Sequence, residues 1–108
     1  MEVLETEGGL RLTGRLDSRT IPDVRLALHR AVDAGSGDLR LDVAGLEIWD
    51  AAGLGLLVGV HRRALHRGRR VLLVDPSSRL LRLMRLARLQ RVLLVADAGT
   101  PSSAAALG

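Results

Sequence analysis

Short apolar runs that alternate with segments of helical periodicity limit most strongly what this chain can fold into. "VLLVD" (71–75) and "VLLVA" (92–96) are built on unbroken apolar runs, a pattern typical of strands that lie centrally in a sheet or are covered on both faces. Another strand is predicted at 39–46, where leucine or valine at alternate positions faces one side. The 108 residues contain no long linker and no internal repeat, so the alternating elements are expected to form one domain.

Two further elements are predicted near the N-terminus. The segment 3–16 has leucines at period two after a pair of glycines, which predicts a β-hairpin. The segment 20–35 predicts a helix, because Thr20 followed by Asp23 is similar to a capping box and Gly35 is a suitable stop.

Near the C-terminus, the segment 78–88 predicts another helix. Its apolar arc includes Leu80, Met84 and Ala87, and its arginines are expected on a solvated face opposite that arc.

The stretch "EIWDAAGLGLLVGVH" (47–61) joins a strand to a helix without a hydroxyl, thiol or imidazole at the junction. Asp50 is predicted as the N-cap of that helix. The buried stripe of the helix is predicted to contain Leu54, Leu57, Val58, His61 and Leu65. We expect His61 to have a packing role there.

The other side of this helix carries Gly55, Gly59, Arg62 and His66. A glycine within a helix costs ~1 kcal/mol relative to alanine, so another group is expected to approach this side closely. On spacing alone, tight packing within the domain and docking of a partner both remain open.

The composition argues against several kinds of site. Cysteine is absent, and the three histidines lack metal-ligand spacing, so we expect neither a metal nor a cofactor. No nucleophile–base pair or carboxylate pair occurs at credible spacing, so we expect no catalytic residue and no enzyme. The net charge is +4 and all sixteen basic residues are arginine, but Trp49 is the only aromatic residue. Direct nucleic-acid binding is therefore not expected.

The chain also lacks the pattern of a targeting or membrane-spanning segment. Its N-terminus is acidic, and its longest uncharged apolar stretch, 51–60, is far shorter than the ~20 residues that cross a bilayer. The expectation is a cytoplasmic protein without membrane insertion, present as a monomer or weak dimer.

Three segments, in order, carry a resemblance to a known family. "GRLDSRTIPDVRLAL" (14–28) is similar to G-x-L-D-x-x-T-x-P/A-x-L-R. "LRLDVAGLEIWDAAGLGLLVGVHRRA" (39–64) is similar to V-x-x-D-L-S-G-V-x-F-L-D-S-S-G-L-G-L-L-x-x-x-x-R-R-A, and "VLLVDPSSRLLRLMRLARLQRVLLV" (71–95) follows at the family's spacing. Together they resemble the STAS domain, and within it the single-domain anti-anti-sigma factors of bacteria. We therefore assign residues 1–97 to a STAS domain and 98–108 to a flexible C-terminal tail.

The resemblance implies an α/β fold with a mixed sheet of four to five strands and helices packed mainly on one face. It implies an anti-sigma factor antagonist in place of an enzyme, regulating transcription by partner switching. In the family, the unphosphorylated domain binds an anti-sigma factor that is also a serine kinase of the GHKL class, and so releases a sigma factor. Phosphorylation of the Ser or Thr before the glycine of D-S-S-G-L-G reverses this binding.

This sequence departs from the family pattern at that switch. Ala52 stands at the phosphoacceptor position and Ala51 replaces the preceding Ser. No Ser, Thr or Tyr occurs between Ser36 and Ser77, so no hydroxyl in that interval can substitute. The site is expected not to take a phosphate.

The resemblance also implies which residues contact the partner. Asp17 and Asp50 match the two acidic positions that flank the switch. Trp49 is either an interface anchor or a core residue. The predicted partner-binding residues are Asp17, Trp49, Asp50, Ala51, Ala52, Gly53, Leu54, Gly55, Gly59 and Arg62.

Two functions remain open at this point. The first is an anti-sigma factor antagonist locked in its binding-competent state. The second is a STAS subunit of another assembly, such as a lipid-transport ABC system or a multi-protein signalling complex.

Overall fold

The computed structural model describes residues 1–96, and the predicted tail at 98–108 lies outside this range. Five strands and three helices follow one another along the chain. They are β1 (Glu2–Thr6), β2 (Gly9–Leu16), α1 (Ile21–Ala34), β3 (Leu39–Ile48), α2 (Ala51–His66), β4 (Val71–Val74), α3 (Ser78–Leu86) and β5 (Leu94–Ala96).

The strands form one mixed sheet in the order β1-β2-β3-β4-β5. β1 pairs antiparallel with β2, and the other three pairings are parallel. Parallel neighbours are joined by right-handed crossovers in nearly all proteins. Because successive parallel strands step in one direction across this sheet, such crossovers place their helices on the same face.

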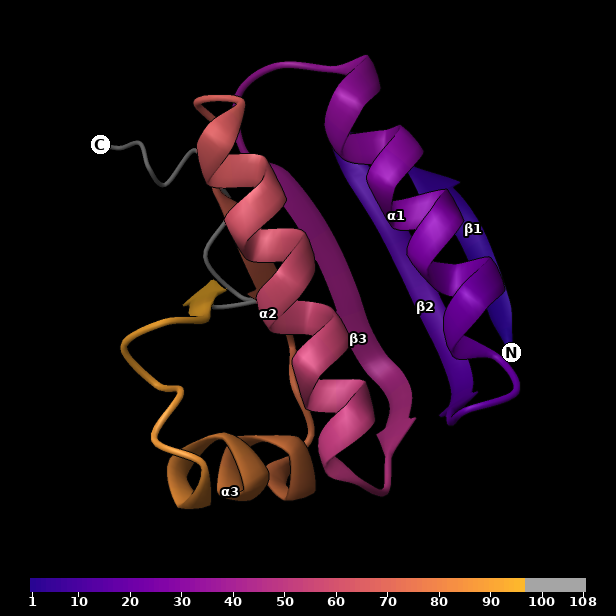
Figure 1. Ribbon diagram of the computed structural model, residues 1–108, viewed down its shortest axis with the longest axis vertical. Coiled ribbons are helices and arrows are strands. Elements are labelled where there is room, and N and C mark those ends of the chain that lie inside the picture. Colours follow the sequence, from indigo (N-terminus) through magenta and orange to yellow (C-terminus); the bar gives the residue numbers. More distant parts are fainter. Residues whose placement is uncertain (97–108) are drawn as a thin grey trace.

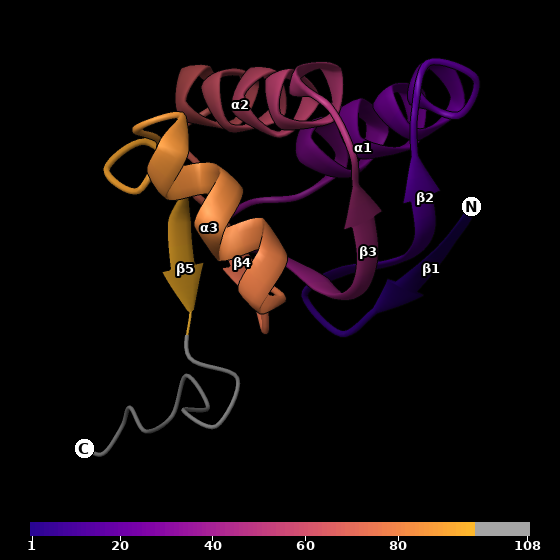
Figure 2. The same cartoon turned by 90° about the horizontal axis from the view of Figure 1, so that it is seen from below.

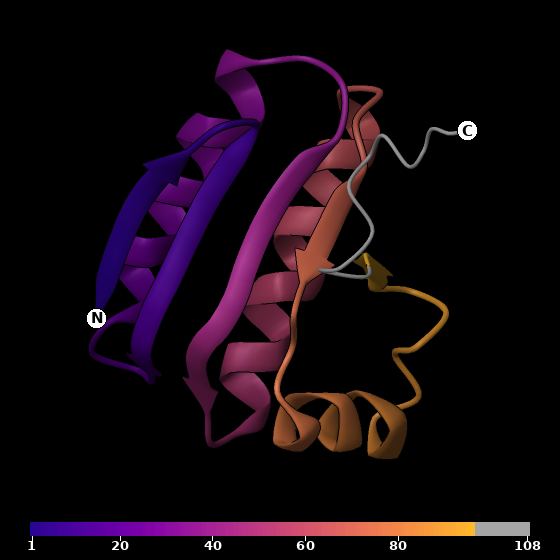
Figure 3. The same cartoon turned by 180° about the vertical axis from the view of Figure 1, so that it is seen from behind.

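α1 and α2 follow this expectation. α1 and α2 lie side by side across one face, whereas the view from behind shows the strands without a helix over them (Figures 1 and 3). α3 lies across the end of the sheet, beyond the carboxyl end of β4 (Figures 1 and 2). The predicted mixed α/β fold, with helices mainly on one face, is confirmed.

The core lies between the sheet and the two side-by-side helices. Leu12, Leu41 and Leu73 are fully buried on three neighbouring strands, and Leu28 and Leu57 of the helices belong to the same cluster. These leucines come from the alternating and helical patterns in the sequence, so local periodicity and burial agree.

The predicted capping box at Thr20 is wrong. Thr20 has helical backbone angles and makes no side-chain cap. Its hydroxyl instead donates to the Arg15 carbonyl (3.1 Å) and accepts from the backbone N–H of Asp17 (2.9 Å). The side chain closes the loop before α1, which a local capping rule does not consider.

Gly35 does end α1, but without the left-handed conformation that favours glycine. Its backbone is extended. A Cβ on Gly35 would lie 3.3 Å from two guanidinium nitrogens of Arg69. Arg69 is buried and donates to the carbonyls of Ala31 (2.9 Å), Val32 (2.7 Å) and Gly37 (2.8 Å). An arginine distant in sequence therefore caps α1, and Gly35 leaves room for it.

The predictions for the C-terminal elements need correction at their limits. α3 ends at Leu86 and Ala87 is exposed, so Ala87 does not belong to the apolar arc with Leu80 and Met84. β5 begins at Leu94, two residues later than predicted, and lies at an edge of the sheet.

The buried face of α2 is also shifted around the helix from the predicted stripe. Leu65 is 53% exposed, whereas Leu56 and Val60 are buried. α2 packs against α1 as well as against the sheet, so the side facing α1 becomes buried. Periodicity alone does not reveal which neighbour lies beside a helix.

Candidate functional site

Adjacent strand ends bring the two predicted acidic residues to one end of the domain. Leu16 and Ile48 are register partners at the ends of β2 and β3. Asp17 follows the first strand, and Trp49 and Asp50 follow the second. The predicted residues from the 17 and 49–52 segments therefore share one edge of the sheet.

Asp17 organises the loop between β2 and α1. Its Oδ1 accepts from the backbone N–H groups of Arg19 (2.9 Å) and Thr20 (3.2 Å). These bonds, that of Arg19 foremost, hold the pKa of the Asp17 carboxyl below its usual value. Asp17 remains ionised and fixes the loop beside the start of α2.

Asp50 is the N-cap of α2, as predicted. Its Oδ1 accepts from the backbone N–H groups of Ala52 (3.1 Å) and Gly53 (3.2 Å). The two alanines that follow, Ala51 and Ala52, are exposed. The position predicted to correspond to the family's phosphoacceptor is thus an accessible helix start that carries only a methyl group.

Trp49 lies on the surface, which resolves the choice between core and exposed positions. Its side chain is 52% exposed. The guanidinium carbons of Arg15 and Arg79 each lie 4.5 Å from the ring centroid. Such cation–π contacts hold an exposed ring in place. An ordered, amphipathic surface therefore adjoins the start of α2.

The glycines of α2 fall into two classes. Gly53 is buried, and a Cβ there would lie 2.8 Å from Cγ2 of Ile48, so packing within the domain accounts for it. Gly55 and Gly59 are exposed, and a Cβ at either would meet no atom within 4 Å. Internal packing does not account for these two glycines. Leu54, like Gly53, faces inward with only 8% exposure.

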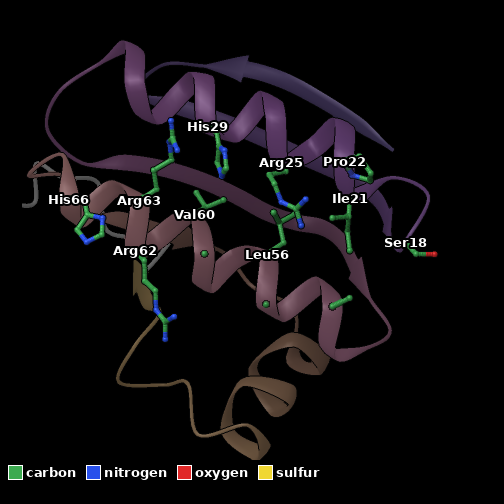
Figure 4. A pocket seen from close by; sticks show the side chains of 13 residues that line it. Ser18, Ile21, Pro22, Arg25, His29, Leu56, Val60, Arg62, Arg63 and His66 are labelled. Carbon is green, nitrogen blue, oxygen red and sulfur yellow. The ribbon is translucent and has the colours of Figure 1, made fainter.

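A groove of about 780 Å³ runs between α1 and α2, from Ala52 to His66 (Figure 4). Gly55 and Gly59 line it, and Ile21, Leu56 and Val60 are its buried apolar lining residues. The other lining residues are Ser18, Pro22, Arg25, His29, Arg62 and Arg63. The groove extends the predicted surface from the helix start along the whole of α2.

The groove is cationic. Its lining residues include three arginines and two histidines but no carboxylate. Arg63 is neutralised by Asp33 of α1, with contacts of 3.0 and 2.6 Å. Arg25 and Arg62 make no ion pair within residues 1–96. Burial, followed by the charges of Arg63 and Arg25, lowers the pKa of His29.

Sequence reasoning identified only part of this surface. It predicted Gly55, Gly59 and Arg62 from α2 but missed Arg25 and His29 of α1. The latter two are four residues apart and so share a helical face, which is a usable signal. Nothing local, however, indicated that this face borders α2.

His61 is buried, as expected for a packing residue. Its Nδ1 has no hydrogen-bond partner in the described part of the chain. Burial lowers the pKa of the imidazole. Within residues 1–96, no group of three histidine, aspartate or glutamate side chains could hold a metal ion, and no helix is long and apolar enough to cross a membrane.

Comparisons with known proteins agree with this architecture. A family model described as "Mlab, STAS domain" matches residues 3–96. Among curated proteins, none matches the chain. Among solved structures, the unphosphorylated anti-sigma factor antagonist SpoIIAA has a TM-score of 0.73 at 19% identity, covering 96% of this chain and 94% of that one.

Two further solved structures are similar. The phosphorylated form of the Bacillus cell fate determinant SpoIIAA has a TM-score of 0.68 at 19% identity, covering 96% of this chain and 97% of that chain. An anti-sigma factor antagonist from Mycobacterium paratuberculosis has a TM-score of 0.67 at 22% identity, covering 87% and 81%. At these identities, the structural matches establish the fold alone.

Proposed function

This chain belongs to the STAS domain family, and on that premise we propose that it is an anti-sigma factor antagonist. In this proposal it acts in the bacterial cytoplasm without catalysing a reaction. It binds an anti-sigma factor that is also a serine kinase of the GHKL class, and thereby releases a sigma factor.

The observation that carries this proposal is the surface at the start of α2. Asp50 caps the helix, Ala51 and Ala52 are exposed, and Trp49 is held beside them by two arginines. A partner can therefore approach the helix start closely. Because Ala52 offers no hydroxyl, the protein stays in its binding-competent state. Its activity is then set by its abundance or by the nucleotide state of the partner.

The test is the substitution Ala52→Asp, measured against the anti-sigma factor recovered by affinity capture. A carboxylate near a helix N-terminus interacts favourably with exposed N–H groups, by ~0.3–1 kcal/mol, so the fold should survive. In a docked complex the same carboxylate would be buried without compensation, which costs several kcal/mol. Affinity measured by calorimetry should drop at least about tenfold, or ~1.4 kcal/mol, while the melting temperature stays within a few degrees.

Ala87→Asp is the matched control, because Ala87 is exposed at the end of α3. It adds the same charge away from the helix start and should leave affinity unchanged. If Ala52→Asp leaves the fold and the affinity unchanged, the start of α2 is not the docking surface.

Phosphotransfer provides an independent test. With the captured kinase and labelled ATP, the wild-type protein should carry no label on residues 45–60, because that segment contains no hydroxyl. Ala52→Ser should restore labelling, since the helix start is accessible. Label on a wild-type peptide from this segment, or a mutant that binds an active kinase without being labelled, would count against the proposal.

A second candidate is a STAS subunit of another assembly, such as one docked on the ATPase of a lipid-transport ABC system. It is favoured by the matching family model, which is described by the name Mlab, and by Ala52, since a permanent subunit needs no phosphorylation switch. Recovery of a transporter ATPase in place of an anti-sigma factor would select this candidate.

A further inference from the structure

We infer that the groove between α1 and α2 binds an acidic amphipathic helix of the protein partner. This inference rests on the proposed function, because it extends the docking surface from Ala52 along α2 and names what that surface recognises. It concerns residues of α1 that the helix start does not include, so the two can be tested separately.

The charge of the groove selects an anionic occupant. Within residues 1–96, only Arg63 of the lining residues has a carboxylate partner, Asp33 of α1. Arg25 points from α1 toward α2, whereas Arg62 points from α2 away from α1 (Figure 4). Arg25 therefore lies within the groove and Arg62 at its α2 side, and neither guanidinium group has a carboxylate partner within residues 1–96. Carboxylates of an occupant could pair with both, and such complementarity favours specific association.

The shape and lining of the groove favour a helix. Gly55 and Gly59 lie one turn apart and leave open space above the α2 backbone, so another backbone could pack closely there. Helix packing distances depend on the side chains at the contact, and small residues allow the shortest ones. From Ala52 to His66 the groove spans about 21 Å at 1.5 Å per residue, which accommodates about four turns of a partner helix.

The buried residues of the groove also indicate which side chains the occupant presents on its apolar side. Ile21, Leu56 and Val60 line the same groove as Arg25 and Arg62. A helix that presents small or aliphatic residues to this strip and carboxylates to Arg25 and Arg62 would satisfy both features. An amphipathic helix docked in a groove is an established mode of protein recognition.

A second copy of this chain does not match the groove with any of its three described helices. α2 and α3 contain no acidic residue. α1 contains only Asp23 and Asp33, and Asp33 is already paired with Arg63 and Arg67. The helices within residues 1–96 therefore favour a different protein as the occupant.

Two pairs of substitutions test the inference. Arg25→Gln with Arg62→Gln removes the two charges that have no ion pair within residues 1–96. Arg82→Gln with Arg85→Gln is the matched control, because it removes two exposed arginines from α3 outside the groove. A Cβ at Gly55 would meet no atom within 4 Å, so Gly55→Leu should block the groove and keep the fold. Circular dichroism and thermal melting confirm folding of each variant.

The first probe is a fluorescent 18-residue amphipathic peptide of leucine, alanine and glutamate, compared with the same peptide carrying glutamine at each glutamate. The wild type should bind the glutamate peptide at least tenfold more tightly. The groove double variant and Gly55→Leu should each lose at least tenfold, and the α3 control should not. Equal binding of both peptides, or equal loss in the control, would overturn the inference. So would equally strong competition by phosphatidylglycerol vesicles or a 20-base-pair DNA duplex.

The second probe is the partner protein used in the Ala52→Asp experiment. If Ala52→Asp abolishes binding but the groove variants bind as tightly as wild type, the groove inference fails and the proposed docking at the helix start stands. If the groove variants lose the glutamate peptide but no anti-sigma factor is recovered as a partner, the inference stands and the proposed function fails.

Discussion

Alanine should stabilise α2 at two of its glycines and destabilise it at the third, although all three lie within seven residues of one helix. Gly55 and Gly59 are exposed, and a Cβ at either position meets no atom within 4 Å. The only change there is the replacement of a flexible residue by the best helix former. Gly55→Ala and Gly59→Ala should each raise the free energy of unfolding by ~1 kcal/mol.

Gly53→Ala should have the reverse effect. Its Cβ would lie 2.8 Å from Cγ2 of Ile48 and 3.5 Å from Cδ2 of Leu16, and both of these side chains are buried. Overpacking of this kind costs ~1–3 kcal/mol, which cancels or exceeds the helix-propensity gain of ~1 kcal/mol. The expected net effect is a destabilisation of up to ~2 kcal/mol.

Urea denaturation followed by far-ultraviolet circular dichroism measures all three variants against wild type. Since 1 kcal/mol corresponds to about 4–8 °C for a domain near this size, thermal melting should separate Gly53→Ala from the other two. Destabilisation by Gly55→Ala or Gly59→Ala, or stabilisation by Gly53→Ala, would refute the division into packed and open glycines. If the open glycines are retained for a partner, the two stabilised variants should also bind it more weakly, a trade-off common at functional surfaces.

Two further predictions concern the buried Arg69 and the buried His61. Arg69→Met should lower the free energy of unfolding by ~2–3 kcal/mol, because carbonyls at the end of α1 lose their donor. Arg70→Met breaks only the exposed pair with Asp38, so it should lower the free energy of unfolding by at most ~1 kcal/mol. Equal losses for the two variants in urea denaturation would contradict the capping role of Arg69. Burial lowers the pKa of His61 in the folded state. As the pH falls toward about 6.5, the ordinary pKa of a histidine, His61 therefore takes up a proton in the unfolded state before it does so in the folded state. The free energy of unfolding should therefore fall as the pH drops from 7 to 5, and it should fall less steeply in His61→Leu. An unchanged pH dependence in that variant would exclude His61 as a cause.

The sequence by itself determined the elements, their alternation and the family. Apolar runs, helical spacing and the Asp50 cap are local features, and each element depends first on its own periodicity. The three segments that resemble the STAS domain predicted a mixed sheet with helices mainly on one face, and the structure confirms it. The prediction that Ala52 stands at the family's phosphoacceptor position also required only the sequence.

The tertiary structure decided which surfaces are open. Spacing placed Gly55 and Gly59 opposite the core but did not distinguish a packed helix side from an exposed one. The family resemblance added Gly53 to them as a predicted partner-binding residue. The distinction depends on Ile48 and Leu16, which come from strands. In the same way, Arg69 caps α1 from more than thirty residues away in sequence.

The groove itself is a product of the sheet order. Because the parallel strands step in one direction and their crossovers have one hand, α1 and α2 become neighbours on the same face. Only then do Arg25 and His29 border Gly55 and Gly59. Local periodicity specifies which side chains share a face of one helix, but the chain must fold before two such faces form a single surface.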